Sequence, residues 1–256
     1  MPRDLSRPLV TGGAGFIGSA LVRLLLERPD VERAVVLDKL TYAGSRAHLP
    51  ADPRLEFVRG DIVDHSLVVE LLETRAITGV FNLAAESHVD RSIERADDFI
   101  ATNITGAFHI LGACREANVP LLQSSTDEVY GSIDPPARFH EDSPLRPSSP
   151  YSASKTSADL LCLAAVTTYG QDVVITRGSN TYGPRQHPEK LIPRMIQCAL
   201  RDQPLPVYGD GLQVRDWMHV DDHANGLIAA FLHGETGGVY NLGAGCERAN
   251  LDLVHE

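Results

Sequence analysis

The sequence has few cysteines, no long apolar segment and no excess of basic residues. Its apolar runs all fall short of the roughly 18 to 20 residues that span a bilayer. Residues 1–7 carry charge without the apolar core of a secretory signal. We therefore expect a cytoplasmic protein without a membrane partner. The formal net charge of −11 argues against a nucleic-acid partner, because such a partner normally requires a basic surface.

The four cysteines follow neither a disulfide nor a metal-site pattern. They lie far apart, at Cys114, Cys162, Cys198 and Cys246, and form no C-x-x-C pair. Two of them fall within apolar helical patterns. We therefore predict buried free thiols and no metal site.

Short apolar or β-branched runs alternate with longer helical patterns along the 256 residues. The predicted strands are 9–11, 34–38, 55–58, 80–84, 120–125 and 172–176. Helical patterns occupy 16–27, about 66–74, 98–117 and 151–169. This alternation predicts an α/β fold with a doubly wound (Rossmann-type) parallel sheet.

A glycine-rich turn, residues 12–18, joins the first predicted strand to the first predicted helix. Gly13, Gly15 and Gly18 have the G-x-G-x-x-G spacing, which allows a tight turn and lets a pyrophosphate approach the helix N-terminus. Asp38 ends the next strand, where a carboxylate can accept from ribose hydroxyls and would repel a 2′-phosphate. The pattern therefore predicts NAD in preference to NADP; the alternative is a glycine turn without a ligand.

The composition changes after about residue 131. Residues 133–150 contain five prolines, and segments 182–193 and 204–216 are rich in Pro, Gly and polar residues. We expect these segments to be loops over the carboxyl ends of the strands, where open α/β sheets bind ligands. The predicted organisation is an NAD-binding domain over 1–178 and a small, loop-rich substrate-binding region over 179–256.

Two further motifs carry acid–base chemistry. Tyr151 and Lys155 lie four residues apart and share one helix face. A nearby ammonium and a positive nicotinamide ring would lower the pKa of the phenol, so that Tyr151 could act as a base. The alternative for an isolated pair of this kind is a surface contact.

The other motif is Thr126-Asp127-Glu128, directly after a predicted strand. Adjacent carboxyl groups at a strand end push their pKa values apart, which suits one acid and one base. The alternative is a solvated loop with incidental charges.

Together these stretches resemble the extended short-chain dehydrogenase/reductase superfamily, and within it the nucleotide-sugar 4,6-dehydratases, especially those acting on dTDP-glucose. The resemblance extends from about residue 9 to about residue 253. Besides the three motifs it includes segments 38–44, 60–62, 84–92, 102–103, 188–193, 208–211 and 215–217. The Thr-Asp-Glu triplet distinguishes these enzymes, because related epimerases and decarboxylases usually lack the acidic pair.

The resemblance implies a role for each catalytic candidate. Tyr151 would take the proton of the sugar 4-hydroxyl while NAD accepts the C4 hydride. Lys155 would orient the ribose, and Thr126 would hold the 4-oxygen. Glu128 would then remove the C5 proton, and Asp127 would protonate the departing 6-hydroxyl.

The resemblance also implies binding residues. The expected NAD-binding residues are Gly12, Gly15, Phe16, Ile17, Gly18, Asp38, Lys39, Leu40, Thr41, Asp61, Ile62, Leu83, Ala84, Ala85, Ser87, Thr102, Tyr151, Lys155 and Thr181. The expected nucleotide-sugar-binding residues are Ser87, Thr126, Asn180, Glu189, Lys190, Tyr208, Arg215 and Asn250. A homodimer through a four-helix interface, formed by the helices near 98–117 and 151–169, is also implied.

Alternatives stay open on the same scaffold. Asn180-Thr181-Tyr182-Gly183 stands where the dehydratases usually carry Asn-Asn-Tyr-Gly, and the variant also occurs in sugar-nucleotide decarboxylases. A 4-epimerase, a glucuronate-type decarboxylase and a non-enzymatic NAD-binding regulator are therefore the competing functions. The sequence does not fix the nucleotide base. The family continues beyond the point that corresponds to Glu256, so we expect the substrate-binding region to be truncated.

Overall fold

The computed structural model describes residues 3–134, 137–207 and 209–255. Its centre is a seven-stranded sheet in which all neighbouring strands run parallel. The order across the sheet is β3-β2-β1-β4-β5-β6-β9. The strands are β1 (Pro8–Thr11), β2 (Ala34–Asp38), β3 (Leu55–Arg59), β4 (Gly79–Asn82), β5 (Leu121–Thr126), β6 (Val173–Gly178) and β9 (Val239–Leu242). The strand order reverses between β1 and β4, which is where sheets of this kind bind ligands.

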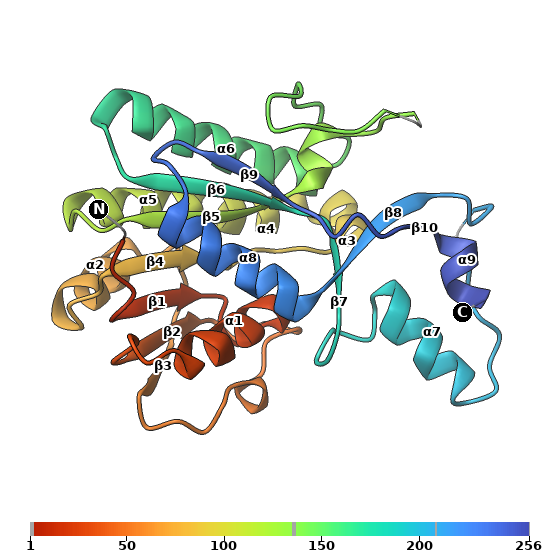
Figure 1. Cartoon of the computed structure of the whole chain (residues 1–256), viewed down its shortest axis with the longest axis horizontal. Helices are drawn as coiled ribbons and strands as arrows, with labels where there is room; N and C mark the ends of the chain where they lie inside the picture. The colour runs from red at the N-terminus through yellow and green to blue at the C-terminus, as the bar shows by residue number, and fades with distance from the viewer. Residues whose placement is uncertain (1–2, 135–136, 208, 256) are drawn as a thin grey trace.

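Helices cover both faces of the sheet (Figure 1). Helices α1 (Phe16–Glu27) and α8 (Val220–His233) pack together on one face. Helices α2 (His65–Thr74), α5 (Ala107–Glu116) and α6 (Pro150–Tyr169) cover the other. Because successive side chains of a strand point to opposite faces, Leu9 and Val10 of β1 belong to two different apolar cores, and both are fully buried.

A smaller sheet lies beside the carboxyl end of the large one (Figure 1). Its order is β10-β8-β7, with β7 (Asn180–Tyr182) parallel to β8 (Val214–His219) and β10 (Glu247–Ala249) antiparallel to it. Helices α7 (Leu191–Ala199) and α9 (Asn250–His255) accompany it. The remaining elements are the short turns η1 (Arg46–His48) and η3 (Asp127–Tyr130), helices α3 (Val89–Glu94) and α4 (Ala96–Phe99), and the π-helix η2 (Ile100–Gly106).

The structure confirms the predicted parallel α/β fold. Each strand predicted before residue 179 is present, with bounds that move by at most two residues, and the predicted helix 98–117 is interrupted by the π-helix η2. The chain after residue 179 holds more regular structure than we expected, and α8 and β9 return to the large sheet. No helix in the described ranges combines the length and the apolar character that crossing a bilayer requires.

A buried ion pair joins α6 to β6 beneath the carboxyl edge of the sheet. The side chain of Asp159 on α6 is fully buried, and it accepts from Nε of Arg177 on β6 at 3.0 Å. The same guanidinium donates to the Tyr130 hydroxyl at 2.8 Å, so it also fixes the turn η3. A charge removed from water is stable only while its partner is present.

We expect Asp159→Asn to lower the free energy of unfolding by about 3–5 kcal/mol, because it leaves the Arg177 guanidinium buried without its counter-charge. Chemical denaturation measures the change. Glu32→Gln is the matched control, since it removes the exposed pair between Glu32 and Arg7 and should have little effect. Equal stability of the two variants would contradict the expectation.

Candidate active site and cofactor cleft

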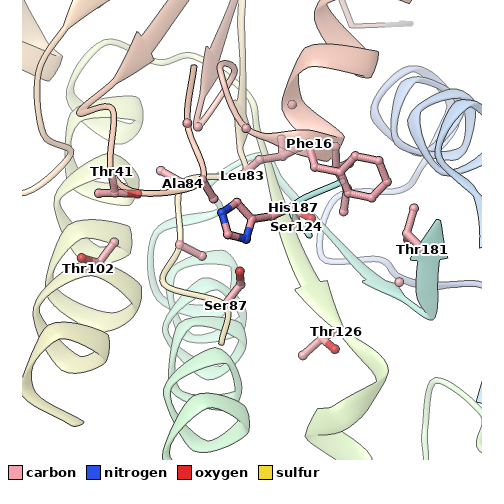
Figure 2. A pocket seen from close by; sticks show the side chains of 18 of the residues that line it. Phe16, Thr41, Leu83, Ala84, Ser87, Thr102, Ser124, Thr126, Thr181 and His187 are labelled. Carbon is pink, nitrogen blue, oxygen red and sulfur yellow. The ribbon is translucent and has the colours of Figure 1, made fainter. Parts of the chain in front are cut away.

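A cleft of about 350 Å³ opens at the carboxyl ends of β1, β2, β4, β5 and β6. Figure 2 shows side chains from several of these strand ends around it, with Phe16 from the start of α1 and Thr102 from η2. Apart from Leu40, all the residues that we expected to bind NAD line this cleft. The fold therefore brings the expected set together, although the set is spread from residue 12 to residue 181.

The glycine turn leaves no room for side chains. Gly12 has φ +67°, and a Cβ there would lie 2.8 Å from the backbone of Ala84. A Cβ on Gly18 would lie 2.2 Å from the carbonyl oxygen of Gly12. The backbone at the N-terminus of α1 is therefore not covered by side chains of these glycines, and a pyrophosphate requires such access to the backbone N–H groups. The residues present therefore fit NAD.

Asp38 connects the glycine turn with the segment that follows β2. Its carboxylate accepts from the backbone N–H of Ala14 at 3.0 Å and from that of Leu40 at 2.8 Å. The second bond supports Leu40 in the left-handed conformation, at φ +57°. Asp38 also lines the cleft, and its carboxylate oxygens can accept further hydrogen bonds there, as binding of ribose hydroxyls would require.

Lys39, the next residue, is held by several acceptors. Its ammonium lies 3.1 Å from the Thr102 hydroxyl, 3.5 Å from the Glu86 carboxylate and 3.6 Å from that of Asp61. These contacts connect the ends of β2, β3 and β4 with η2.

The five catalytic candidates meet at one side of the cleft. Thr126 ends β5, Asp127 and Glu128 begin η3, and Tyr151 and Lys155 lie on α6. Ser149 and Ser152 form a capping box that starts α6, with Pro150 in its first turn. This start places Tyr151 in the first turn and Lys155 one turn later on the same face, as predicted.

The two carboxyl groups differ in their surroundings. Burial, and then the charge of Glu128, raise the pKa of Asp127 to about 6. Partial removal from water also raises the pKa of Glu128, but the positive charges of Arg215 and Lys190 oppose that shift. The pKa of Asp127 is therefore brought nearer to neutral pH, whereas two positive charges favour the ionised form of Glu128.

The pKa of Tyr151 differs from our expectation. We expected Lys155 and a nicotinamide ring to lower it; among the protein groups, burial and then the charge of Glu128 raise it, and a hydrogen bond with Thr126 opposes the rise. The Lys155 ammonium donates to the carbonyl of Ser124 at 2.6 Å, and burial lowers its own pKa to about 8. The protein side chains alone therefore keep the phenol of Tyr151 protonated.

Tyr42 and Glu189 connect the two sides of the cleft mouth. The Tyr42 hydroxyl donates to the Glu189 carboxylate at 3.1 Å, and the Arg91 guanidinium lies over the Tyr42 ring at 3.7 Å from its centroid. Glu189 also lies 3.4 Å from His88, whose other ring nitrogen accepts from the N–H of Arg91 and caps α3. Glu189 therefore connects its own segment, which precedes α7, with the loop after β2 and with the start of α3.

The expected nucleotide-sugar residues occupy two adjoining hollows. Ser87, Thr126 and Lys190 line the main cleft, whereas Arg215 and Asn250 line a neighbouring pocket. Asn180 and Glu189 line both. Tyr208 lies outside the described residues. In the neighbouring pocket Asn250 Oδ1 is buried without a hydrogen-bond partner, as a ligand-binding acceptor would be.

Several cleft residues were missing from our sequence predictions. Tyr42, Gln186, His187 and His223 all line the cleft, and Figure 2 shows the His187 side chain among the labelled residues around it. Tyr42 belongs to the 38–44 motif, and Gln186 and His187 belong to a loop that we expected to cover the site. His223 gave no signal, because it lies on α8, which the sequence did not reveal.

The fold and the site together define a dinucleotide-dependent enzyme of the extended short-chain dehydrogenase/reductase class. The model of the NAD dependent epimerase/dehydratase family matches residues 8–243. The chain therefore belongs to the NAD-dependent epimerase/dehydratase family.

Similar proteins agree with this assignment. A dTDP-glucose 4,6-dehydratase of Streptomyces griseus is 50% identical, over 96% of this chain and 76% of its own length. A low-salt glycan biosynthesis protein of Haloferax volcanii is also 50% identical, over 97% of this chain and 80% of its own. The solved structure of DesIV, a dTDP-glucose 4,6-dehydratase from Streptomyces venezuelae with NAD bound, has a TM-score of 0.93 at 50% identity, covering 97% of this chain and 79% of that one.

We expect Glu128→Gln to lower the pKa of Asp127 from about 6, because the charge of Glu128 is the second cause of the rise. Burial persists in the variant, so the pKa should stay above the ordinary value for aspartate. Titration of labelled Asp carboxyl groups by NMR measures it. Glu73→Gln, an exposed change on α2, is the control, and an unaltered Asp127 pKa in Glu128→Gln would contradict the coupling.

Proposed function

We propose that the protein is an NAD-dependent lyase that catalyses 4,6-dehydration of a nucleotide-activated hexose, with dTDP-glucose as substrate and the 4-keto-6-deoxy sugar nucleotide as product. The observation that carries the proposal is the meeting of Asp127, Glu128 and Tyr151 beside the glycine cradle, in one cleft. Relatives that are dTDP-glucose 4,6-dehydratases are 45% to 50% identical over nearly the whole chain.

When bound among the residues of the glycine turn, NAD would supply a reversible hydride acceptor for C4 and C6 of the sugar. Tyr151 receives the proton of the 4-hydroxyl, and Thr126 holds the oxygen that becomes the ketone. The ketone acidifies the C5 proton, which Glu128 removes. Asp127 gives its proton to the 6-hydroxyl, which leaves as water. C5 takes back a proton from Glu128 when C6 receives the hydride.

The split between the carboxyl groups supports these roles. An acid that must donate near neutral pH needs a raised pKa, and burial with a charged neighbour provides it at Asp127. A base must stay ionised, and Arg215 and Lys190 favour the ionised form of Glu128. Epimerisation and decarboxylation on the same scaffold need no such pair, which is why dehydration is preferred.

Two measurements follow the reaction: the mass of the sugar nucleotide and the amount of NADH. Supplied with dTDP-glucose, the protein should release a sugar nucleotide lighter by one water, without net accumulation of NADH, because the hydride is returned. Unchanged mass with inverted C4 would instead indicate a 4-epimerase, and loss of carbon dioxide from a glucuronate substrate a decarboxylase. A panel of nucleotide-glucoses identifies the base.

Tyr151→Phe should reduce turnover by a factor on the order of 100 or more, because it removes the group that takes the 4-hydroxyl proton. The matched control is Tyr169→Phe, the same change at an exposed position on the same helix, which should keep wild-type turnover. Unaltered activity of Tyr151→Phe would exclude the enzymatic role given to that side chain.

We also propose that the protein is a homodimer whose interface includes α5 and α6. Large apolar side chains are exposed there: Phe108 on α5 is 55% exposed, Leu160 on α6 is 53% exposed, and Ile100 at the start of η2 is 50% exposed. These helices pack against one another within the chain, and a second copy that covered their exposed apolar side chains would remove them from water.

Leu160→Arg should shift the protein from dimer to monomer, because it places a charge in the apolar interface. Sedimentation velocity measures the change. Leu200→Arg, at a position that is 82% exposed beyond α7, is the control and should stay dimeric. If both variants sediment as the wild type does, α6 is not at the interface.

The cytoplasm is the compartment that we propose for this activity. Nucleotide sugars and NAD are both available there, and the free thiols of the four cysteines suit a reducing environment.

A further inference from the structure

His223 on α8 has no part in the chemistry above, yet it lines the cofactor cleft. Its side chain is buried, with 3% of the residue exposed. Its ring lies against the backbone of Gly178 at the end of β6, so closely that a Cβ on Gly178 would lie 2.4 Å from Cε1 of the imidazole. The ring therefore has one fixed place at the edge of the large sheet.

The hydrogen bonds of Thr181 define which ring nitrogen carries the proton. The Thr181 hydroxyl lies 2.7 Å from Nδ1 of His223 and 3.1 Å from the carbonyl oxygen of Ser179. Both bonds form when the hydroxyl donates to Ser179 and accepts from Nδ1–H. The opposite tautomer would lose the bond to Ser179 and would place a proton on Nε2, which is buried without a partner.

His223 is also neutral at the pH of the cytoplasm. Burial lowers the pKa of its imidazole to about 4. Its bond to Thr181 therefore joins two uncharged groups in a dry environment, where losing one partner costs the desolvation of the other.

Thr181 lies where the chain passes from the large sheet to the small one. Only Ser179 separates β6 from β7, and Thr181 is the central residue of β7. The Gln186 amide donates to the Thr181 carbonyl at 2.7 Å, and β8 pairs with β7 at Met218. The bond to His223 ties the Thr181 side chain to α8, a helix that packs on the large sheet.

We infer that His223 is a positioning residue, whose Nδ1–H bond to Thr181 fixes the β6–β7 junction against bound NAD. The inference rests on the proposed function only in taking NAD as the ligand. It makes the orientation of Thr181, and with it one wall of the cofactor cleft, depend on a side chain of α8.

The test separates the two ring nitrogens. In His223→Asn the amide nitrogen can replace Nδ1, whereas in His223→Gln it falls near the position of Nε2. At the other end of the bond, Thr181→Ser keeps the hydroxyl and Thr181→Val removes it. The dissociation rate of NAD, measured without sugar nucleotide by displacement with a fluorescent analogue, is the readout.

We expect His223→Gln and Thr181→Val each to accelerate NAD dissociation about tenfold, and His223→Asn to stay within about threefold of wild type. Thr181→Ser should release NAD more slowly than Thr181→Val, because it keeps the hydroxyl. The double variant with Gln and Val should release NAD about as fast as either single variant, because both changes break the same bond. For the dehydration reaction, kcat should fall in the same order while KM for the sugar nucleotide changes little.

Equal rates for His223→Asn and His223→Gln, or a wild-type rate for Thr181→Val, would overturn the inference. If His223→Gln fails to fold in a thermal melt, the Thr181 pair decides alone. A wild-type protein that binds NAD but does not dehydrate dTDP-glucose would refute the proposed function while leaving the NAD dissociation test intact.

Discussion

Removal of charged groups from water is the constraint on which this cleft depends. The parallel strands end at one edge of the sheet, and the chain places Asp127, Glu128 and Lys155 there together. Burial raises the pKa of Asp127 and lowers that of Lys155, so both groups titrate nearer to neutral pH than they would in water. The acid–base character of the site follows from where the strands end, more than from any single contact.

The buried pair of Asp159 and Arg177 supports this edge from below. Asp159 lies one turn after Lys155 on α6, and its charge opposes the fall in the pKa of the lysine. Arg177 donates to the Tyr130 hydroxyl in η3, the turn that also carries Asp127 and Glu128. One buried ion pair therefore connects α6 with η3, the two elements that carry the residues for which we propose acid–base roles.

The sequence was sufficient for the parts of the molecule whose signals are local. Strand and helix periodicity in the first 178 residues, the glycine turn and the Tyr151–Lys155 spacing each depend on neighbours a few residues apart. The small sheet was not predictable in this way, because strands such as β7 and β10 are three residues long and are held by pairing with β8. His223 illustrates the same limit: its importance arises from Gly178 and Thr181, which lie more than 40 positions earlier in the chain.

We expected two positive charges, those of Lys155 and of a nicotinamide ring, to lower the pKa of Tyr151, and the structure does not bear out the first of them. Burial and Glu128 hold the proton on the phenol, so the side chains of the protein do not by themselves make Tyr151 a base. A positive charge beside the ring favours the ionised form. Oxidised NAD carries that charge on its nicotinamide ring and reduced NAD does not. Tyr151 would therefore give up its proton most readily when a hydride can be accepted, and would hold a proton while the ketone persists. On that argument, burial keeps the proton on Tyr151 by default, and the redox state of the retained cofactor decides when the proton leaves.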